Sequence, residues 1–144
     1  MAAFDIENIT QQFFRAVIEK RADDIVNHYV ASPDLYVHVE GPRWSTIGYD
    51  KVSTGWRAFT DAPLSVENIE WIEGPRGEAS GDMAWIGGIL EMTVRVGENV
   101  NKVRLRGTYV LRQGDDGHWR IMHEHFSQPA TDPYGIGDWL PAKK

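Results

Sequence analysis

Apolar residues recur at helical spacing in the first part of the chain. Near the start they lie three or four positions apart, which predicts an amphipathic helix with one buried face: Ile6, Ile9, Phe13, Ala16 and Val17. The same reasoning predicts a short second helix that ends near Tyr29, and a third helix over residues 49–60 in which Trp56 lies on the apolar face. A strand over residues 35–39 separates the second helix from the third.

Beyond Pro63 the pattern changes to that of β-strands. Four β-rich segments follow one another, separated by turns that contain glycine: residues 66–72, 82–96, 101–113 and 118–127. Helices first and a meander of strands last predict an α+β fold. Gly87 and Gly88 interrupt the second of these strands, which predicts a bulge or a sharp bend. We expect one domain over residues 1–130 and an irregular tail over residues 131–144.

The last two strands carry most of the candidate chemistry. A Gly-Asp-Asp-Gly turn joins them, and side chains alternate between the two faces of each strand. A turn centred on Asp115 would pair Arg106 with Glu124 and Leu105 with His125, and the pattern of the two faces supports this pairing or one shifted by two residues. One face would then carry the arginines together with Glu124. The other face would be mainly apolar and would include Tyr109, Leu111, Trp119, Ile121, His123 and His125.

The closing strand resembles that of a known superfamily. Residues 116–129, with the sequence DGHWRIMHEHFSQP, are similar to the last strand of the nuclear transport factor 2-like superfamily in its SnoaL-like branch. The association domain of calcium/calmodulin-dependent kinases has a similar strand, with an Asp-Gly-x-Trp turn followed by His-x-His and Ser. The resemblance implies a cone-shaped roll, in which a strongly curved, mainly antiparallel sheet wraps around the N-terminal helices. It also implies an internal pocket for a small molecule and a homodimer that buries the outer face of the sheet.

The two faces of the last strands allow two assignments. Periodicity alone favours the apolar face as the core and leaves the arginines in water, because charged side chains are seldom fully buried. Resemblance to the ketosteroid isomerase branch implies the reverse: the arginine face lines the pocket, and the apolar face forms the subunit interface. On this second assignment the expected ligand-binding residues are Arg104, Thr108, Met122, Phe126, Phe13 and Trp56.

Arg106 and Glu124 are the main catalytic candidates on that assignment. Burial raises the pKa of a glutamate and a neighbouring guanidinium lowers it, so Glu124 could be tuned toward general-base work. Alternatively, Arg106 neutralises Glu124 as a structural ion pair, or Arg104 or Arg106 binds a carboxylate ligand. The ketosteroid isomerases use an aspartate base, a tyrosine and a protonated aspartic acid, none of which this chain has at the matching places. Those places fall near Gly41, Phe13 and Thr108. Tyr29, Tyr36 and Tyr49 could serve as acid or donor groups, although most tyrosines in such positions are packing residues.

His123 and His125 are two residues apart on one strand and therefore share a face. His38 or His118 could approach them. Such a pair can begin a metal site, but a good site needs three or four converging ligands, and no third ligand is evident on this face. We therefore expect histidines at a subunit interface, with no metal and no cofactor.

Composition narrows the range of partners. The 144 residues carry a net charge of −6 and the basic residues are scattered, which argues against a nucleic-acid partner. The chain has no cysteine, which excludes disulfides and thiolate zinc sites. The start lacks the pattern of a signal sequence and no apolar segment is long enough to span a bilayer, so we expect a cytoplasmic protein without a membrane partner.

Two functional classes stay open. The first is a non-catalytic domain that binds a small molecule or assembles with copies of itself, and the missing isomerase residues favour it. The second is a cofactor-free isomerase, hydrolase or cyclase that acts on a small, largely apolar molecule, with Glu124 as acid/base and Arg106 orienting it. A strongly raised pKa at a pocket Glu124 would favour the enzyme.

Overall fold

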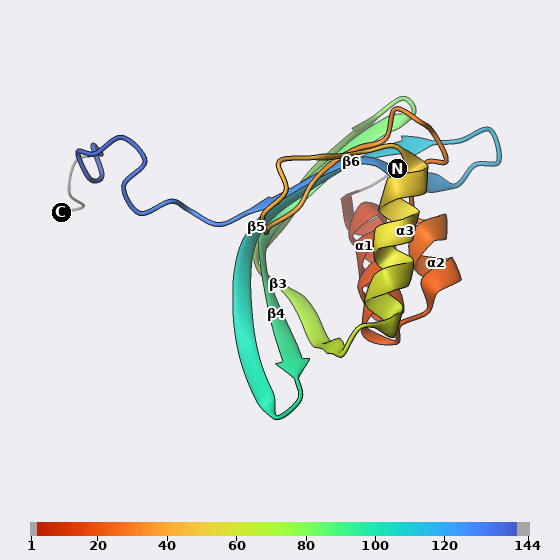
Figure 1. Ribbon diagram of the computed structural model, residues 1–144. Helices are drawn as coiled ribbons and strands as arrows, with labels where there is room; N and C mark the ends of the chain where they lie inside the picture. Colours follow the sequence, from red (N-terminus) through yellow and green to blue (C-terminus); the bar gives the residue numbers. More distant parts are fainter. Residues whose placement is uncertain (1–2, 141–144) are drawn as a thin grey trace.

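Three helices cover one face of a curved sheet in the computed structural model, which describes residues 3–140 (Figure 1). The helices are α1 (Ala3–Ile18), α2 (Ala22–Asn27) and α3 (Tyr49–Asp61). The strands are β1 (Tyr36–His38), β2 (Thr46–Ile47), β3 (Leu64–Ser80), β4 (Met83–Val96), β5 (Asn99–Gln113) and β6 (Trp119–Ser127). The prediction of an α+β fold with a curved sheet around N-terminal helices is confirmed.

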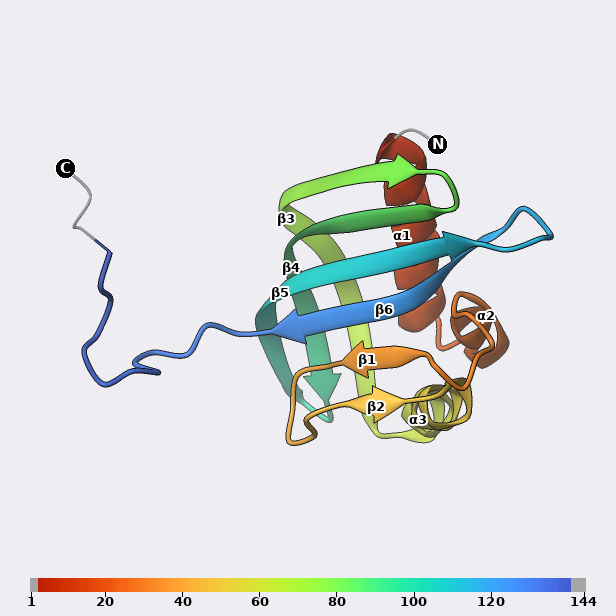
Figure 2. The ribbon, with the colours of Figure 1, turned by 90° about the horizontal axis from the view of Figure 1, so that it is seen from above.

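The sheet is a single layer of six strands in the order β2-β1-β6-β5-β4-β3 (Figure 2). Neighbouring strands run antiparallel, except for β1 and β6, which run parallel. This arrangement brings residues 36–38, from the first half of the chain, beside residues 123–125 of the last strand. The sheet curves around the helices and does not close (Figure 1).

The core lies between α1 and the helix-facing side of the sheet. The predicted stripe of α1 is buried there, including Ile6, Phe13, Ala16 and Val17, because residues at this spacing share one helix face. Buried side chains from the strands pack in the same core: Ile69, Leu90, Leu105, Tyr109, Leu111, Ile121 and Phe126.

Gly87 and Gly88 lie in β4, where its pairing with β3 is irregular. The pairing of β3 with β4 shifts register on both sides of Glu73, which lies opposite Ile89. A Cβ on Gly88 would overlap the carbonyl oxygen of Glu73 and would lie 3.1 Å from the Trp71 ring. The predicted irregularity at these glycines is confirmed, because the backbones approach there too closely for a side chain.

The pairing centred on Asp115 is wrong. Next to the turn the register is the alternative shifted by two residues, with Gln113 opposite Trp119 and Leu111 opposite Ile121, and it changes again beyond Leu111. The structure pairs Arg106 with Ser127 and Tyr109 with Glu124. The strands begin to pair only at Gln113, so the connection between them is longer than a tight turn centred on one residue. Arg106 and Glu124 therefore do not face each other.

A bulge in β6 changes the alternation of its side chains. Val110 pairs with His123, but the next residue, Leu111, pairs with Ile121, which leaves Met122 as an extra residue in β6. A bulge of this kind brings residues an odd number of positions apart to the same face. Ile121 and Glu124 are accordingly both buried on the helix-facing side.

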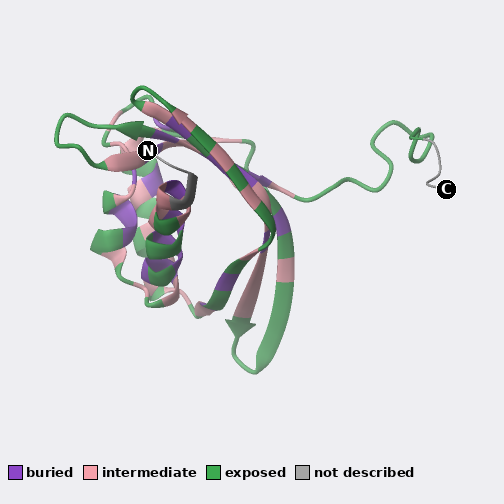
Figure 3. Cartoon of the chain, turned by 180° about the vertical axis from the view of Figure 1, so that it is seen from behind, coloured by how far each residue is buried: buried purple, intermediate pink, exposed green. Residues whose placement is uncertain are grey.

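The apolar face of β5 and β6 belongs to the core. Tyr109, Leu111 and Ile121 are buried against the helices, so their assignment to an outer subunit interface is wrong. Arg104 and Arg106 lie on the exposed face of β5, and their assignment to a pocket lining is wrong as well. Figure 3 shows buried residues alternating with exposed ones along the strands. Periodicity alone favoured the apolar face as the core and the arginine face in water. This assignment holds for β5, because charged side chains stay in water.

The chain after β6 leaves the domain. Residues 128–140 form neither helix nor strand, are exposed and extend away from the sheet (Figure 3). Side-chain contacts give this segment local order. Gly137 N donates to Asp132 Oδ1 over 2.8 Å, Leu140 N donates to Asp138 Oδ1 over 2.9 Å, and the rings of Tyr134 and Trp139 lie 5.1 Å apart. No helix within residues 3–140 is long and apolar enough to cross a lipid bilayer.

The close approach at Gly88 predicts the effect of adding one methyl group. Gly88→Ala should lower the free energy of unfolding by about 2 kcal/mol, because the Glu73 carbonyl must move. Gly55→Ala is the matched control: this glycine is exposed inside α3 with nothing near its Cβ position, so alanine should stabilise by about 1 kcal/mol. Urea denaturation measures both, and two variants shifted in the same direction would contradict the packing described.

Candidate functional site

A buried carboxyl group lies on the helix-facing side of the sheet. Glu124 in β6 is 2% exposed, and its Oε1 accepts a hydrogen bond of 2.5 Å from the Tyr29 hydroxyl. The Tyr29 oxygen accepts a hydrogen bond of 3.0 Å from Nε1 of Trp56 in α3. We call Trp56, Tyr29 and Glu124 the buried network, since it joins α3, the segment after α2 and β6.

Backbone hydrogen bonds hold Tyr29 in place. The segment after α2 forms a parallel bridge to the start of β6, with Tyr29 opposite Ile121. The N–H of Ile121 donates to the carbonyl of His28 over 2.7 Å, and the N–H of Val30 donates to the carbonyl of Ile121 over 2.9 Å. The position of the phenol is therefore set by main-chain pairing and not by its side-chain contacts alone.

Aromatic rings enclose the buried network. Phe13 of α1 makes edge-to-face contacts with Tyr29, Trp56 and Tyr109, at centroid distances of 5.7, 5.7 and 6.0 Å. Phe126 of β6 lies edge-on to Tyr109 at 5.1 Å. Surroundings of this kind lower the local dielectric, which strengthens hydrogen bonds and raises the cost of an unpaired charge.

Burial decides how these groups are protonated. It raises the pKa of the Glu124 carboxyl to about 7, against the opposing effect of the hydrogen bond from Tyr29, and the charge of Glu40 adds to the rise. Burial, followed by the charge of Glu124, holds the pKa of Tyr29 well above its ordinary value, and the pKa of Tyr109 is raised for the same reasons. Near neutral pH the phenols stay protonated, while Glu124 exchanges between its acid and its carboxylate.

The second oxygen of Glu124 is free of protein partners. Oε2 accepts no hydrogen bond from the described residues. Within residues 3–140, no side-chain oxygen or nitrogen that is sealed from solvent lacks a partner, so Oε2 keeps contact with solvent. The carboxyl is thus held by one oxygen and can accept or donate at the other.

The structure brings some predicted site residues together and separates others. Four of them meet in the interior: Glu124, Phe13, Trp56 and Phe126. Met122 is half buried at the bulge. Three more lie on the exposed face of β5, across the sheet from the network: Arg104, Arg106 and Thr108.

The predicted ion pair between Arg106 and Glu124 does not form. The Arg106 guanidinium donates instead to Ser127 Oγ over 3.1 Å and to the Gln128 carbonyl oxygen over 3.2 Å. Tyr29 takes the place of the arginine as the donor to Glu124. Because this donor is neutral, no nearby positive charge offsets the cost of burial, and the pKa of the carboxyl rises instead of falling.

Tyr109 is an interior residue that sequence analysis left outside the site, and Tyr29 is one that it offered only among three tyrosines that could donate. Tyr29 follows a short helix and precedes an irregular segment, so no periodicity indicates where its side chain points. Tyr109 shares a face of β5 with Leu105 and Leu111, and alternation by itself would have put all three inside. Tyr109 was left out of the candidate site because the arginine face had been chosen as the pocket lining.

A histidine cluster lies on the outer face of the sheet. His38 in β1 lies beside His123 and His125 in β6, with ring centroids 5.6 and 5.2 Å apart. Nδ1 of His123 lies 2.7 Å from the Tyr36 carbonyl oxygen, and Nδ1 of His38 lies 3.0 Å from that of Trp44. Of the two histidines that the sequence offered as neighbours, His38 is the one that lies beside the pair. No group of three His, Asp or Glu side chains in the part of the chain that the structure describes is arranged to hold a metal ion.

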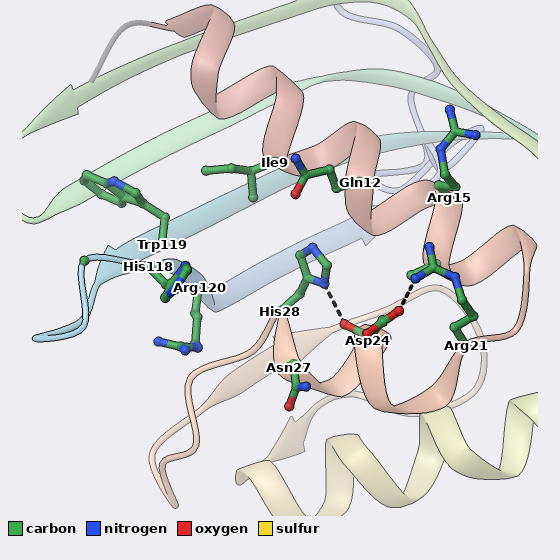
Figure 4. Close-up of a pocket in the computed structure, with 12 residues that line it drawn as sticks. Ile9, Gln12, Arg15, Arg21, Asp24, Asn27, His28, His118, Trp119 and Arg120 are labelled. Atoms are coloured by element: carbon green, nitrogen blue, oxygen red, sulfur yellow. Dashed lines mark hydrogen bonds and ion pairs between the residues drawn. The ribbon is translucent and has the colours of Figure 1, made fainter.

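A groove of about 820 Å³ opens between α1, α2 and residues 117–120 (Figure 4). We call it the α1–α2 groove. Its lining does not include the buried network, but the His28 ring at its centre lies edge-on to Phe13 at 5.3 Å. A second cavity of about 330 Å³ is lined in part by Tyr29 and Arg112. The concave surface and the buried carboxyl are therefore neighbouring but separate features.

Comparison with known proteins identifies the family. Residues 6–131 match the SnoaL-like domain family. The match spans most of the chain, so this chain belongs to the SnoaL-like domain family, and the resemblance predicted from the closing strand is confirmed. No curated protein matches the sequence.

Solved structures share the fold at low sequence identity. A nuclear transport factor 2-like superfamily protein from Salmonella enterica has a TM-score of 0.75 at 16% identity, over 93% of this chain and 95% of that one. A Xanthomonas campestris structure named as a calcium/calmodulin-dependent protein kinase II association domain has a TM-score of 0.73 at 15% identity, over 88% and 86%. A ketosteroid isomerase-like protein from Erwinia carotovora atroseptica has a TM-score of 0.69 at 15% identity, over 84% and 91%. At these identities the likeness shows the fold alone.

The raised pKa of Glu124 makes stability depend on pH. The group titrates near 7 in the folded state and near its ordinary value of 4.5 in the unfolded state, so between these values only the folded state keeps the proton. The free energy of unfolding should then fall by about 3 kcal/mol as pH rises from 4.5 to 7, and stay level above that window. Glu124→Gln cannot titrate but still accepts the hydrogen bond, so it should remove this fall.

Urea denaturation at a series of pH values checks this expectation. Glu98→Gln, in the exposed turn after β4, is the matched control and should keep the wild-type profile. A fall of the same size in Glu124→Gln and in the wild type would show that the carboxyl is not the source.

Proposed function

We propose that this SnoaL-like domain binds a small, largely apolar molecule beside Glu124, on the helix-facing side of the sheet. The observation that carries the proposal is the buried network. In it, hydrogen bonds join an indole N–H, a phenol and a carboxyl among aromatic rings. Polar groups are costly to bury, and a few of them in an apolar lining are what orients a small ligand. The fold is compatible with many functions, so the proposal depends on these residues.

Glu124 gives the bound molecule a proton donor or acceptor. A pKa of about 7 suits general acid/base catalysis, which is most efficient when the pKa lies near the working pH. Tyr29 holds Oε1, which orients the carboxyl and directs Oε2 at the ligand. These features favour the enzyme class over a passive binder: a cofactor-free isomerase, hydrolase or cyclase in which Glu124 moves a proton.

Tyr29 has the orienting role that the sequence suggested for Arg106. A neutral donor keeps the carboxyl basic, whereas a guanidinium would have lowered its pKa and weakened it as a base. The chemistry differs from that of the ketosteroid isomerases, because Phe13 lies where their tyrosine falls and offers only a ring edge. Tyr109 lies opposite Glu124, and its raised pKa keeps its hydroxyl a hydrogen-bond donor. It can therefore stabilise an oxyanion that develops on the ligand.

The proton-transfer role can be tested with 5-nitrobenzisoxazole, an apolar aromatic compound that eliminates when a base removes one C–H proton. The rate should exceed that of buffer and rise with pH around an apparent pKa near 7. Glu124→Gln should lower it by about 100-fold. Tyr29→Phe removes a bond that favours the charged carboxylate, so the midpoint should move to higher pH. Glu98→Gln should change neither the rate nor the midpoint.

Calorimetric binding of the unreactive analogue 5-nitrobenzotriazole separates the two functional classes. Binding together with elimination supports the enzyme, while binding without elimination returns the domain to the non-catalytic class. Equal elimination rates in wild type and Glu124→Gln would remove the role of Glu124. A lack of binding would contradict the site itself.

Assembly is a second function, and the outer face of the sheet favours it. One row of cross-strand neighbours runs across that face from β2 to β4: Ile47, Tyr36, His123, Val110 and Trp85. Ile47, Tyr36 and Trp85 are exposed, and contiguous exposed apolar residues mark interaction surfaces. We infer a homodimer packed through this row. It would use the face expected from the family resemblance and keep His123 in it. Ile47, Tyr36, Val110 and Trp85 would replace the buried Tyr109, Leu111 and Ile121.

A charge in the middle of this row should prevent pairing. Trp85→Arg is expected to convert the dimer into a monomer at micromolar concentration, because two guanidinium groups related by the dimer axis would be buried without partners. Val100→Arg, at another exposed apolar position, is the control and should leave the dimer intact. Sedimentation velocity gives the answer, and a monomeric wild type would rule out the interface.

A further inference from the structure

The α1–α2 groove is rich in positive charge although the whole chain is acidic. The chain carries a net charge of −6. The charged residues that line the groove are three arginines and one carboxylate: Arg15, Arg21, Arg120 and Asp24. A concave surface with an excess of one sign of charge concentrates ions of the other sign. The groove is therefore suited to an anion.

The cations of the groove differ in how far they are already neutralised. Arg120 makes two hydrogen bonds to the Asp116 carboxylate, of 2.7 and 3.1 Å. Arg21 pairs with both Glu19 and Asp24. The side chain of Arg15 has no hydrogen bond or ion pair with the described residues. Arg15 is thus the group with a planar fork of donors to spare, and a carboxylate is the ligand that matches it.

His28 adds an acceptor at the centre of the groove. Its Nδ1 lies 2.7 Å from the Asp24 carbonyl oxygen, which can only accept, so Nδ1 carries the hydrogen and Nε2 has a lone pair. Burial lowers the pKa of the ring and keeps it neutral. The ring nitrogen that does not bond Asp24 points toward α1, on the side of Gln12 (Figure 4). A neutral imidazole in this orientation recognises a hydroxyl or N–H donor.

The groove also has an apolar end. Trp119 is half buried and lies with Arg120 at one end, whereas Arg15 and Arg21 lie at the other and His28 lies between (Figure 4). Ile9 of α1 forms the apolar wall beside Trp119. An aromatic ligand body would pack on Trp119 while its acidic group reaches Arg15. A volume of about 820 Å³ is ample for such a molecule.

We propose that the α1–α2 groove binds a small aromatic carboxylic acid that also carries a hydroxyl group. Arg15 binds the carboxylate, Nε2 of His28 accepts from the hydroxyl, and Trp119 packs against the ring. This site is separate from the one at Glu124 and does not depend on it.

The probe is 3-phenyllactate, whose hydroxyl lies between its ring and its carboxylate as His28 lies between Trp119 and Arg15 (Figure 4). It is titrated into the full chain with calorimetry and with intrinsic tryptophan fluorescence. Arg15→Gln should weaken binding by about tenfold, because a charge-assisted hydrogen bond is lost. The neutral analogue 3-phenyllactamide should bind the wild type about tenfold more weakly for the same reason, and 3-phenylpropanoate should be weaker because it has no hydroxyl for His28. Arg104→Gln, an exposed arginine on the far face of the sheet, is the matched control and should bind as the wild type does.

Each outcome decides between the sites. Weaker binding in Arg15→Gln with unchanged binding in Glu124→Gln supports the groove. The reverse pattern places the probe at Glu124 and overturns the inference, without affecting the function proposed there. Equal binding of the acid and its amide, or no binding of the acid at millimolar concentration, overturns it too. Arg15 is exposed, so an unchanged melting temperature in Arg15→Gln confirms that the variant is folded.

Discussion

One extra residue in β6 decides which side chains face the helices. Met122 has no partner in β5, and so Ile121 and Glu124 both lie on the buried side although they are three positions apart. In a regular strand these two residues would lie on opposite faces, and Glu124 would share the outer face with the arginines. The bulge therefore creates the buried carboxyl on which the candidate site depends.

A carboxyl in this position constrains its neighbours. A buried charge without partners is unfavourable, so the fold supplies a donor from Tyr29 and leaves the group with a pKa near neutrality. Tyr29 is in turn a poor acid and a reliable donor, because it is buried next to the same carboxyl. The indole of Trp56 satisfies the phenol oxygen. Each polar group makes the burial of the next one acceptable, which links three segments that are distant in sequence.

The short segment after α2 contributes to two different surfaces. Its backbone pairs with Ile121 of β6, and His28 at its start has helical dihedral angles and caps α2. Tyr29 points into the interior toward Glu124, while His28 points to the α1–α2 groove and touches Phe13 with its ring edge. The interior is aromatic and holds a titrating acid, whereas the groove is open and positively charged. Two ligand chemistries can therefore coexist in one small domain.

The sequence by itself determined the features that depend on local pattern. The helix stripe from Ile6 to Val17, the irregularity at Gly87 and Gly88, the α+β order and the family all follow from spacing or from a short motif. Only the tertiary structure decided the register of β5 and β6, the exposure of Arg106 and the pairing of Tyr29 with Glu124. Alternation assigns faces only while a strand stays regular. The bulge lies where β6 changes its neighbour from the segment after α2, opposite Ile121, to β1, opposite His123, and these neighbours come from distant parts of the sequence. No local pattern therefore shows where the alternation breaks.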